Sequence, residues 1–212
     1  MLALNKPAGL LSQPDHTGEP DLITLTRAWL KDKYSKPGNV YVGLVHRLDK
    51  PASGAMVLAR TSKAARRMSA AFKARDVEKK YLAVIEGRLT GSGMMEDFLR
   101  RMTRPVRTVV DPESGKYAQL YWQAIAHVDG NTVVGVDLIT GRPHQIRCQF
   151  AHRGHPLLGD RRYGACSTLP GVHLALHCRA IALPHPVRPD PLEIVAPIPA
   201  SWGSYASAIR TW

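Results

Sequence analysis

The chain has 212 residues, 44% of them hydrophobic, so it can bury one substantial core and need not divide into two domains. Its 29 Lys and Arg exceed its 17 Asp and Glu and give a formal net charge of +12. This excess favours polyanionic partners, with nucleic acid ahead of an acidic membrane surface. No apolar run approaches the roughly 20 residues that span a bilayer, and no cationic segment leads into a long apolar one at the start. We therefore expect a cytoplasmic protein with no membrane contact.

Three cysteines, Cys148, Cys166 and Cys178, are an odd number without C-x-x-C spacing, which predicts free buried thiols instead of disulfides or a zinc ribbon. Histidines gather in the C-terminal half, and His173 and His177 could share one helical face. No H-E-x-x-H or comparable ligand set accompanies them. We expect no metal, because RNA contact or ordinary packing explains these histidines more simply.

The first elements alternate strand and helix. Residues 1–4 read as a short strand, and residues 21–33 read as a helix with four apolar side chains on or near one face: Leu22, Leu25, Trp29 and Leu30. Two β-like runs follow at residues 41–45 and 55–59, and their closeness predicts antiparallel neighbours. Thr61 or Ser62 can then cap a helix that reaches about Lys73.

Later elements are mainly strands. Residues 78–86 predict a strand, residues 116–126 and 132–138 a hairpin around Asp129-Gly130-Asn131, and residues 143–152 a short helix. The last strand candidates are residues 174–183 and 192–196. This order favours an α+β class with a mainly antiparallel sheet.

Four arginines lie between residues 100 and 107, where neither helical nor strand periodicity is evident. We interpret this segment as a basic loop over a phosphate backbone, with Arg101, Arg104 and Arg107 as RNA contacts. The alternative is an arginine-rich surface loop without a ligand.

Residues 46–54 read His-Arg-Leu-Asp-Lys-Pro-Ala-Ser-Gly and are the most informative segment. Asp49 follows an apolar run and precedes Pro51 and Gly54, which favours a strand end where a cleft can hold the carboxylate. An ionised, partly desolvated carboxylate can attack a sugar carbon, and the adjacent Arg47 could keep it charged by lowering its pKa. The alternative is a surface ion pair that stabilises little.

This segment resembles the signature of the RluA family of pseudouridine synthases, H-R-L-D followed by two variable residues and T-S-G. Ala52 departs from it, standing where Thr is usual. Four further segments also resemble the family and stand in the family's order along the chain: one before this segment, at residues 5–10, and three after it, at residues 79–83, 141–147 and 155–163. Five ordered matches along most of one domain argue against chance.

The resemblance implies an α+β fold of the pseudouridine synthase type, with a mainly antiparallel mixed sheet and a central catalytic cleft. It implies an isomerase that detaches uracil from ribose, turns it and rejoins it through carbon, in a structured ribosomal or transfer RNA. That reaction has no redox change and no external donor, so we expect no cofactor and no required protein partner. Because the first motif begins at Asn5, we expect residues 1–212 to be one catalytic domain without the N-terminal RNA-binding module of many relatives.

By the same resemblance, Asp49 matches the catalytic aspartate, and Arg147 matches the arginine that pairs with it. Tyr81 matches the active-site tyrosine whose ring packs on the uracil and whose hydroxyl can help to remove the carbon-5 proton. A planar guanidinium suits a desolvated carboxylate better than Lys does. Whether Asp49 attacks the sugar, attacks the base or assists elimination stays open. Without the resemblance, Tyr81 reads equally well as a buried structural tyrosine and Arg147 as an exposed helix residue.

Chemistry on a base requires its removal from the stack. The resemblance implies that Arg47 fills the gap, with His46 beside it, although Arg47 could instead only screen Asp49. Ile146 is a candidate apolar wall for the base, while Arg142 and His144 are candidates to contact phosphate or to brace their loop.

Two other classes of function stay open. One is a noncatalytic RNA-binding or chaperone protein that keeps the fold, a possibility raised by Ala52. The other is a hydrolase that uses Asp49 with histidines, with or without a metal. The target nucleotide and the oligomeric state cannot be read from these motifs.

Overall fold

The computed structural model describes residues 1–209, which fold into a single large sheet with helices on both faces. The strands are β1 (Leu2–Lys6), β2 (Gly43–Leu44), β3 (Ser53–Ala59), β4 (Glu78–Ile85), β5 (Ser92–Thr103), β6 (Val106–Val110), β7 (Lys116–Val128), β8 (Asn131–Leu138), β9 (Leu176–Pro184) and β10 (Pro191–Val195). The helices are α1 (Leu22–Lys33), α2 (Ser62–Ala74), α3 (Gln145–His152), α4 (Ser204–Ala208) and the 3-10 turns η1 (Arg161–Tyr163) and η2 (Ala200–Trp202).

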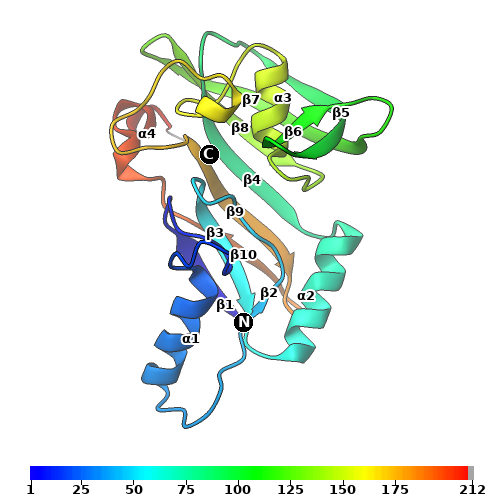
Figure 1. Cartoon of the computed structure of the whole chain (residues 1–212), viewed down its shortest axis with the longest axis vertical. Coiled ribbons are helices and arrows are strands. Elements are labelled where there is room, and N and C mark those ends of the chain that lie inside the picture. Colours follow the sequence, from blue (N-terminus) through cyan, green and yellow to red (C-terminus); the bar gives the residue numbers. More distant parts are fainter. Residues whose placement is uncertain (210–212) are drawn as a thin grey trace.

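The sheet is mainly antiparallel, with the strand order β1-β3-β9-β4-β8-β7-β5-β6; β2 joins β3 and β10 joins β9 (Figure 1). Among the described strands, only β3 and β9 pair in parallel. The predicted α+β class, the β2–β3 neighbours and the β7–β8 hairpin are confirmed. β3, β9 and β4 are consecutive neighbours, and Gly54 of β3 and Tyr81 of β4 both lie opposite Cys178 of β9, which brings the signature loop next to Tyr81.

The two faces of the sheet carry different helices. Leu30 of α1, Met68 of α2 and Phe150 of α3 belong to one buried cluster. Leu82 of β4 points to the opposite face, where it packs in a second cluster with Trp202. Successive strand residues face opposite sides, so β4 contributes to both clusters and links them.

Both early helices begin at side-chain caps. Asp21 accepts a hydrogen bond from the backbone N–H of Thr24 at 3.0 Å, and Thr61 caps α2 as predicted. The apolar face predicted for α1 is partly wrong, because Leu25 and Trp29 are 50% and 48% exposed. Helical geometry turns them away from the stripe that meets the sheet, which Leu22, Ile23, Thr26 and Leu30 form instead.

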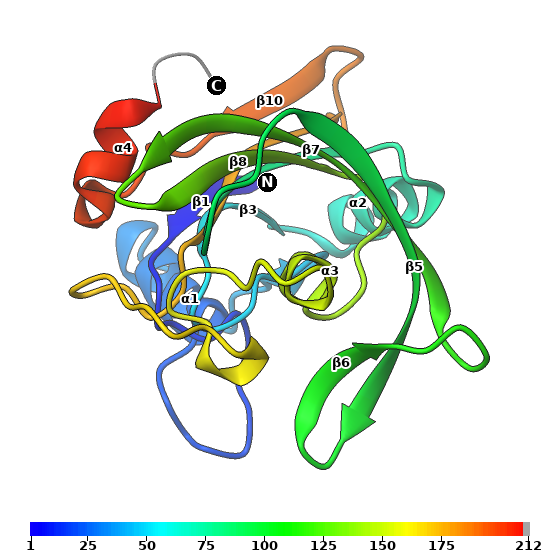
Figure 2. The ribbon, with the colours of Figure 1, turned by 90° about the horizontal axis from the view of Figure 1, so that it is seen from above.

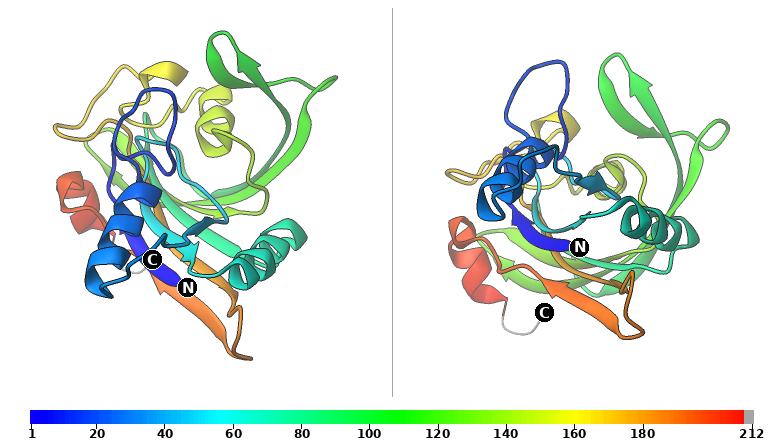
Figure 3. Two further views of the ribbon diagram at one scale, coloured as in Figure 1. Left: turned by 60° about the horizontal axis from the view of Figure 1, so that its bottom comes forward. Right: turned by 90° about the horizontal axis from the view of Figure 1, so that it is seen from below.

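The arginine-rich segment predicted as a loop is a β-hairpin. β5 and β6 pair in register from Leu99 opposite Val110 to Thr103 opposite Val106. Beyond Leu99 most side chains on this ribbon are exposed, so backbone hydrogen bonds define the strands where no apolar alternation marks them. Figure 2 shows β8, β7 and β5 bending around α3, and Figure 3 shows the hairpin projecting from the body of the molecule.

The structure tests the predictions made for the three cysteines and for membrane-spanning segments. Cys148 and Cys178 are free and buried as predicted, but Cys166 is exposed in the loop after η1, so the prediction is wrong for this thiol. Its backbone N–H donates to the Glu86 carboxylate at 3.1 Å, which holds the loop at the surface. No helix in the described part of the chain is both long and apolar enough to cross a bilayer.

Candidate active site

The loop that carries Asp49 joins β2 to β3, and a glycine fixes its end. Gly54 has φ +120°, and a Cβ added there would lie 2.3 Å from the carbonyl oxygen of Cys178 on β9. Only glycine tolerates both the backbone angle and this close approach. At the other end of the turn, the N–H of Ala52 donates to the carbonyl of Asp49 at 3.0 Å.

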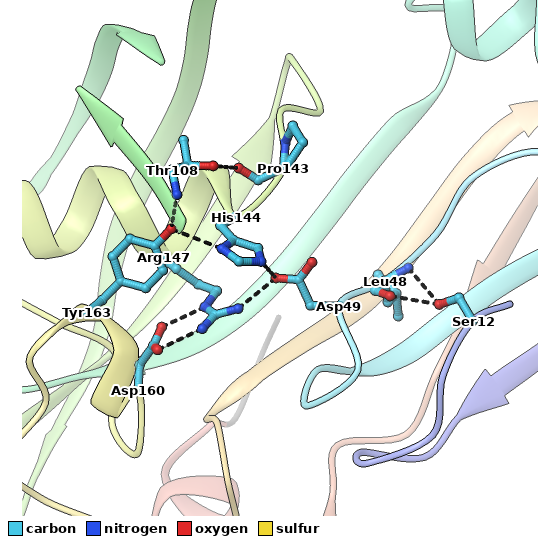
Figure 4. A network of polar contacts seen from close by, with 9 residues as sticks. All are labelled: Ser12, Leu48, Asp49, Thr108, Pro143, His144, Arg147, Asp160 and Tyr163. Carbon is cyan, nitrogen blue, oxygen red and sulfur yellow. Dashed lines mark hydrogen bonds and ion pairs between the residues drawn. The ribbon is translucent and has the colours of Figure 1, made fainter. Parts of the chain in front are cut away.

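Residues near the N-terminus hold both backbone neighbours of Asp49. The Ser12 hydroxyl donates to the carbonyl of Leu48 at 2.7 Å and accepts its N–H at 3.2 Å (Figure 4). The fully buried Lys6 ammonium donates to the carbonyl of Lys50 at 3.1 Å. Burial lowers the pKa of Lys6 to about 8, against an opposing pull from Asp49. The loop is therefore anchored on both sides of the carboxylate.

Asp49 pairs with Arg147 of α3, as Figure 4 shows. Arg147 Nη1 donates to Asp49 Oδ2 at 3.0 Å, while Nε and Nη2 donate to the two oxygens of Asp160 at 2.7 and 2.8 Å. Within residues 1–209, no donor contacts Asp49 Oδ1. The guanidinium therefore fixes one oxygen of Asp49, and the other has no donor in the described part of the chain.

Burial differs across this cluster, which we call the acid–guanidinium cluster (Asp49, Arg147 and Asp160). The side chain of Asp49 is 26% exposed, whereas those of Arg147 and Asp160 are 6% and 2% exposed. Burial lowers the pKa of Arg147, but hydrogen bonds and attraction from Asp160 and Asp49 outweigh it and raise that pKa above its ordinary value. Arg147 is therefore a permanent cation, and Asp160 is the anion that compensates its burial.

His144 approaches Asp49 from the start of α3. Its Nε2 lies 3.8 Å from Asp49 Oδ2, and its Nδ1 lies 3.0 Å from the hydroxyl of Tyr163, which also accepts the N–H of Thr108 at 2.7 Å. Because the Tyr163 oxygen already accepts the N–H of Thr108, its hydroxyl proton is available to donate to His144 Nδ1. Nδ1 is then the acceptor, and the ring proton of His144 lies on Nε2, toward the carboxylate. Burial lowers the pKa of His144; attraction to Asp49 opposes this effect and repulsion from Arg147 adds to it, so the neutral ring is favoured.

A cleft of about 500 Å³ opens beside Asp49. Eight of the residues singled out in the sequence line it: His46, Arg47, Asp49, Tyr81, Arg142, His144, Ile146 and Arg147. Arg101, Arg104 and Arg107 are exposed on the β5–β6 hairpin and do not line it. The motifs separated along the chain thus converge on one cavity, with the hairpin arginines outside.

Tyr81 and Ile146 give the cleft its apolar wall. Both side chains are buried, at 7% and 4% exposure. Burial raises the pKa of Tyr81 well above its ordinary value, with further contributions from Cys178 and Asp49. Tyr81 therefore presents a neutral phenol, which suits packing on a planar base better than proton abstraction by a phenolate.

The two residues before Leu48 differ in orientation. His46 stacks on Phe72 with ring centroids 4.8 Å apart, and its Nε2 accepts the N–H of Val57 at 2.9 Å. Burial, then Lys79, lowers its pKa to about 4, so the ring is neutral at pH 7. This geometry braces the loop, and since His46 also lines the cleft, its expected place beside Arg47 in RNA binding stays a prediction.

Arg47 is exposed at the cleft, and the ion pair of Asp49 is with Arg147, not with the adjacent Arg47. No ion pair between Arg47 and the Asp49 carboxylate therefore supports the screening role considered for Arg47. Arg142 donates from Nε to the carbonyl of Tyr117 at 2.9 Å, so at least one of its nitrogens braces the loop before α3.

Sequence reasoning assigned no role to Ser12, Thr108, Asp160 and Tyr163, which support the site together with Lys6 of the matched segment 5–10. Asp160 and Tyr163 lie within the matched segment 155–163, and that match was the available signal. Ser12 and Thr108 act through contacts that join distant parts of the chain, for which no local pattern exists. In residues 1–209 no group of three or more His, Cys, Asp or Glu could hold a metal ion, and His177 lies on β9, not on a helix.

Comparison with known proteins agrees with this geometry. Residues 1–152 match the family model described as RNA pseudouridylate synthase. The chain is 34% identical to the ribosomal large subunit pseudouridine synthase D of Xylella fastidiosa, over 99% of this chain and 67% of the relative. The corresponding protein of Vibrio cholerae is also 34% identical, over 99% of this chain and 68% of its own length.

A solved structure entitled human RNA pseudouridylate synthase domain containing 4 superposes with a TM-score of 0.79 at 22% identity, covering 97% of this chain and 87% of that chain. Human RNA pseudouridylate synthase domain containing 1 gives a TM-score of 0.70 at 24% identity, covering 92% and 78%. At these identities the two structures establish the shared fold. The family match and the near full-length relatives establish more: the chain belongs to the RNA pseudouridylate synthase family, whose members are isomerases that convert uridine in RNA to pseudouridine.

Proposed function

We propose that this isomerase acts on a uridine in ribosomal RNA of the large subunit, with Asp49 as the nucleophile. The observation that carries the proposal is a carboxylate at a cleft with one oxygen fixed by Arg147 and the other unengaged. The names of the relatives, ribosomal large subunit pseudouridine synthases, support the choice of RNA. We also propose that residues 1–212 act as one catalytic unit, because a single sheet runs from β1 to β10.

The demanding step is the cleavage of the glycosidic bond. A carboxylate next to the anomeric carbon can attack it or stabilise its developing positive charge, as carboxylates do in glycoside hydrolysis. Arg147 keeps Asp49 oriented, and Asp160 holds Arg147 by two bonds, so the attacking oxygen needs little rearrangement. The detached uracil then turns, and its C5 bonds to the anomeric carbon as the bond from that carbon to Asp49 breaks. C5 loses its proton and N1 gains one, so the product is an isomer of the substrate.

The base needs a surface that holds it while it turns. Tyr81 and Ile146 supply a neutral ring and an aliphatic side chain in the same cleft. Packing on these groups restrains the uracil plane without fixing its rotation about the plane's normal, since aromatic and aliphatic contacts are weakly directional. In this proposal Tyr81 is a packing surface first.

RNA binding falls to cations around the cleft. Extrusion of a base costs about a few kcal/mol. Arg47 is exposed at the cleft and can occupy the space that the uridine leaves, while Arg142 lines the same opening. The hairpin arginines Arg101, Arg104 and Arg107 extend the positive surface toward the flanking phosphates. The reaction rearranges the bonds of one nucleoside without net oxidation, so we propose no cofactor.

The experiment that tests this function is a pseudouridine map. Total RNA from cells with and without the gene is treated with carbodiimide and read by reverse-transcription stops. We expect one or more stops in large-subunit ribosomal RNA to vanish with the gene and to return with the wild-type chain. Identical maps in both strains would contradict the proposal, and a lost stop confined to transfer RNA would contradict the choice of RNA.

A further inference from the structure

A second cavity, of about 640 Å³, borders the acid–guanidinium cluster. Asp49, His144 and Arg147 line both this cavity and the first cleft. A group bonded at Asp49 therefore adjoins two open spaces. The matched segment 155–163 supplies part of the lining of this second space, but the sequence assigned no ligand to it, and the bond changes on the uridine itself do not use it.

The wall of the second cavity combines cations with an apolar turn. Arg161 and Arg162 of η1 are exposed and line it, together with Lys50. Opposite them runs the segment 168–173, where the N–H of Val172 donates to the carbonyl of Leu169 at 2.9 Å. This composition suits a ligand that has both a phosphate and a planar, partly apolar group.

The cavity is built on the same anchor as the catalytic cluster. Asp160 precedes η1 directly and is held by Arg147 through two bonds. Gly159 has φ +84°, and a Cβ there would lie 2.9 Å from the carbonyl oxygen of His173. Its N–H donates to the carbonyl of Ser167 at 3.0 Å, so the two walls of the cavity are fastened to each other. The shape is thus fixed relative to Asp49.

We propose that the second cavity binds the nucleotide covalently joined to the target uridine, with its phosphate at Arg161 and Arg162 and its base against residues 169–172. This inference rests on the proposed function. When the uridine ribose lies at Asp49, the adjoining nucleotide is one phosphodiester away and has to leave the cleft past the cluster. A free phosphate would make no contact with the apolar turn, and an apolar peptide would leave the charges of the arginines without a partner. The neighbour of the uridine satisfies both.

The test crosses a protein change with an RNA change. The substrate is an RNA fragment with a uridine that the wild-type chain converts, so a failure of the proposed function appears before any variant is compared. The RNA is made with an uncharged methylphosphonate linkage on the 5′ or the 3′ side of that uridine. The protein is wild type, Arg162→Ala, or Arg188→Ala, a matched loss of an exposed arginine that lines neither cavity.

We expect the uncharged linkage on one side to lower the kcat/KM of the wild type by about tenfold, since it removes one charge-assisted hydrogen bond. On the normal RNA, the kcat/KM of Arg162→Ala should be about tenfold below that of the wild type. On the RNA with the uncharged linkage, the variant and the wild type should have the same kcat/KM, and kcat at saturating RNA should be unchanged. Arg188→Ala should respond as the wild type does. The phosphate site would be overturned if Arg162→Ala lowered kcat/KM by the same factor on the normal RNA and on both altered RNAs. It would also be overturned if Arg162→Ala lowered kcat/KM on none of them.

A second RNA tests the base. An abasic nucleotide on the side identified above should raise the KM of the wild type by about fivefold or more, because the RNA can no longer stack a base on the protein surface. The same change on the other side should have a smaller effect. If abasic nucleotides on both sides leave KM unchanged, the cavity does not hold a base, and the proposal is wrong in that half. Arg161→Ala provides a second cationic variant if Arg162→Ala is poorly folded.

Discussion

The acid–guanidinium cluster and the β5–β6 hairpin are both rich in charge, yet they are built in opposite ways. In the cluster, Arg147 is 6% exposed and every charge has a partner at hydrogen-bond distance. On the hairpin, Arg101, Arg104 and Arg107 are exposed and their charges project into solvent. Buried pairs fix geometry, whereas exposed cations act at a distance and are screened by salt. The first arrangement suits bond chemistry, and the second suits the attraction of a polyanion.

Hydrogen bonds of Thr108 link the two regions through intermediate residues. Thr108 on β6 donates its N–H to Tyr163 at 2.7 Å and its hydroxyl to the carbonyl of Pro143 at 2.7 Å. Tyr163 in turn contacts His144, which faces Asp49 (Figure 4). The base of the hairpin is therefore fastened to the rim of the cleft, although its arginines lie beyond it.

The largest expected effect comes from removing the proposed nucleophile. Asp49→Asn keeps the size of the side chain but removes the charge, and we expect the single-turnover rate of pseudouridine formation to fall by at least about 10⁴-fold. Product is measured by carbodiimide treatment and reverse transcription. Glu113→Gln, a matched loss of one exposed carboxylate, should leave the rate unchanged. A normal rate for Asp49→Asn would exclude it as the nucleophile.

Arg147→Met should affect both stability and turnover. It leaves Asp160 buried without a cation and Asp49 unoriented, so we expect the free energy of unfolding to fall by about 3–5 kcal/mol. Urea unfolding followed by tryptophan fluorescence measures this decrease. Arg153→Met is the matched control, because Arg153 pairs with Asp97 but is 34% exposed, and we expect a cost of about 1 kcal/mol or less. Equal costs for the two variants would contradict the contrast in burial.

Replacing Arg101, Arg104 and Arg107 together by Gln should weaken RNA binding by about tenfold or more while leaving kcat at saturating RNA unchanged. The slope of log affinity against log salt should become shallower by about 0.7–0.9 for each phosphate that the variant no longer neutralises. Fluorescence anisotropy at several salt concentrations measures both quantities. The control removes the same charge from α1, as Arg27, Lys31 and Lys33 changed to Gln. If the two triple variants weakened RNA binding equally, the hairpin arginines would contribute only through the net charge of the chain, and not through their position.

A smaller effect concerns pH. Burial lowers the pKa of His46 to about 4 in the folded chain, against about 6.5 when unfolded. The unfolded chain therefore binds more protons between these values, and the stability present above pH 6.5 is lost as the pH falls toward 4. His46→Gln should reduce this decline between pH 6.5 and 5 by about 1 kcal/mol per pH unit, as measured by urea unfolding. An unchanged dependence would show that His46 is not the group responsible.

The same contrast explains how far the sequence could be interpreted. Asp49, Tyr81 and Arg147 lie in continuous motifs, so resemblance located them. The strands β3 and β4 were predicted from their own residues, and β7 was predicted as half of a hairpin around residues 129–131. Asp160 sits in a matched motif too, but flanked by Gly159 and Arg161 it looks like an ordinary surface turn. Its role depends on Arg147 reaching it from another element.

Other features leave no local pattern. Ser12 holds Leu48 across a separation of 36 residues, and Thr108 meets Tyr163 across 55. The hairpin has no recognisable strand pattern because its ribbon buries few side chains beyond Leu99, so the period of two disappears. Adjacency alone favours Arg47 as the partner of Asp49, while the folded chain supplies Arg147 from a position 98 residues away.

The central claim is that bond chemistry resides at Asp49 and RNA attraction on the cationic surface around it. The most direct measurement follows bound RNA and converted uridine in the same samples, for Asp49→Asn and for the hairpin triple variant. We predict that Asp49→Asn binds RNA like the wild type and forms no pseudouridine, and that the triple variant needs more RNA but converts it at the normal maximal rate. Pseudouridine formed by Asp49→Asn at a rate near that of the wild type would contradict the account.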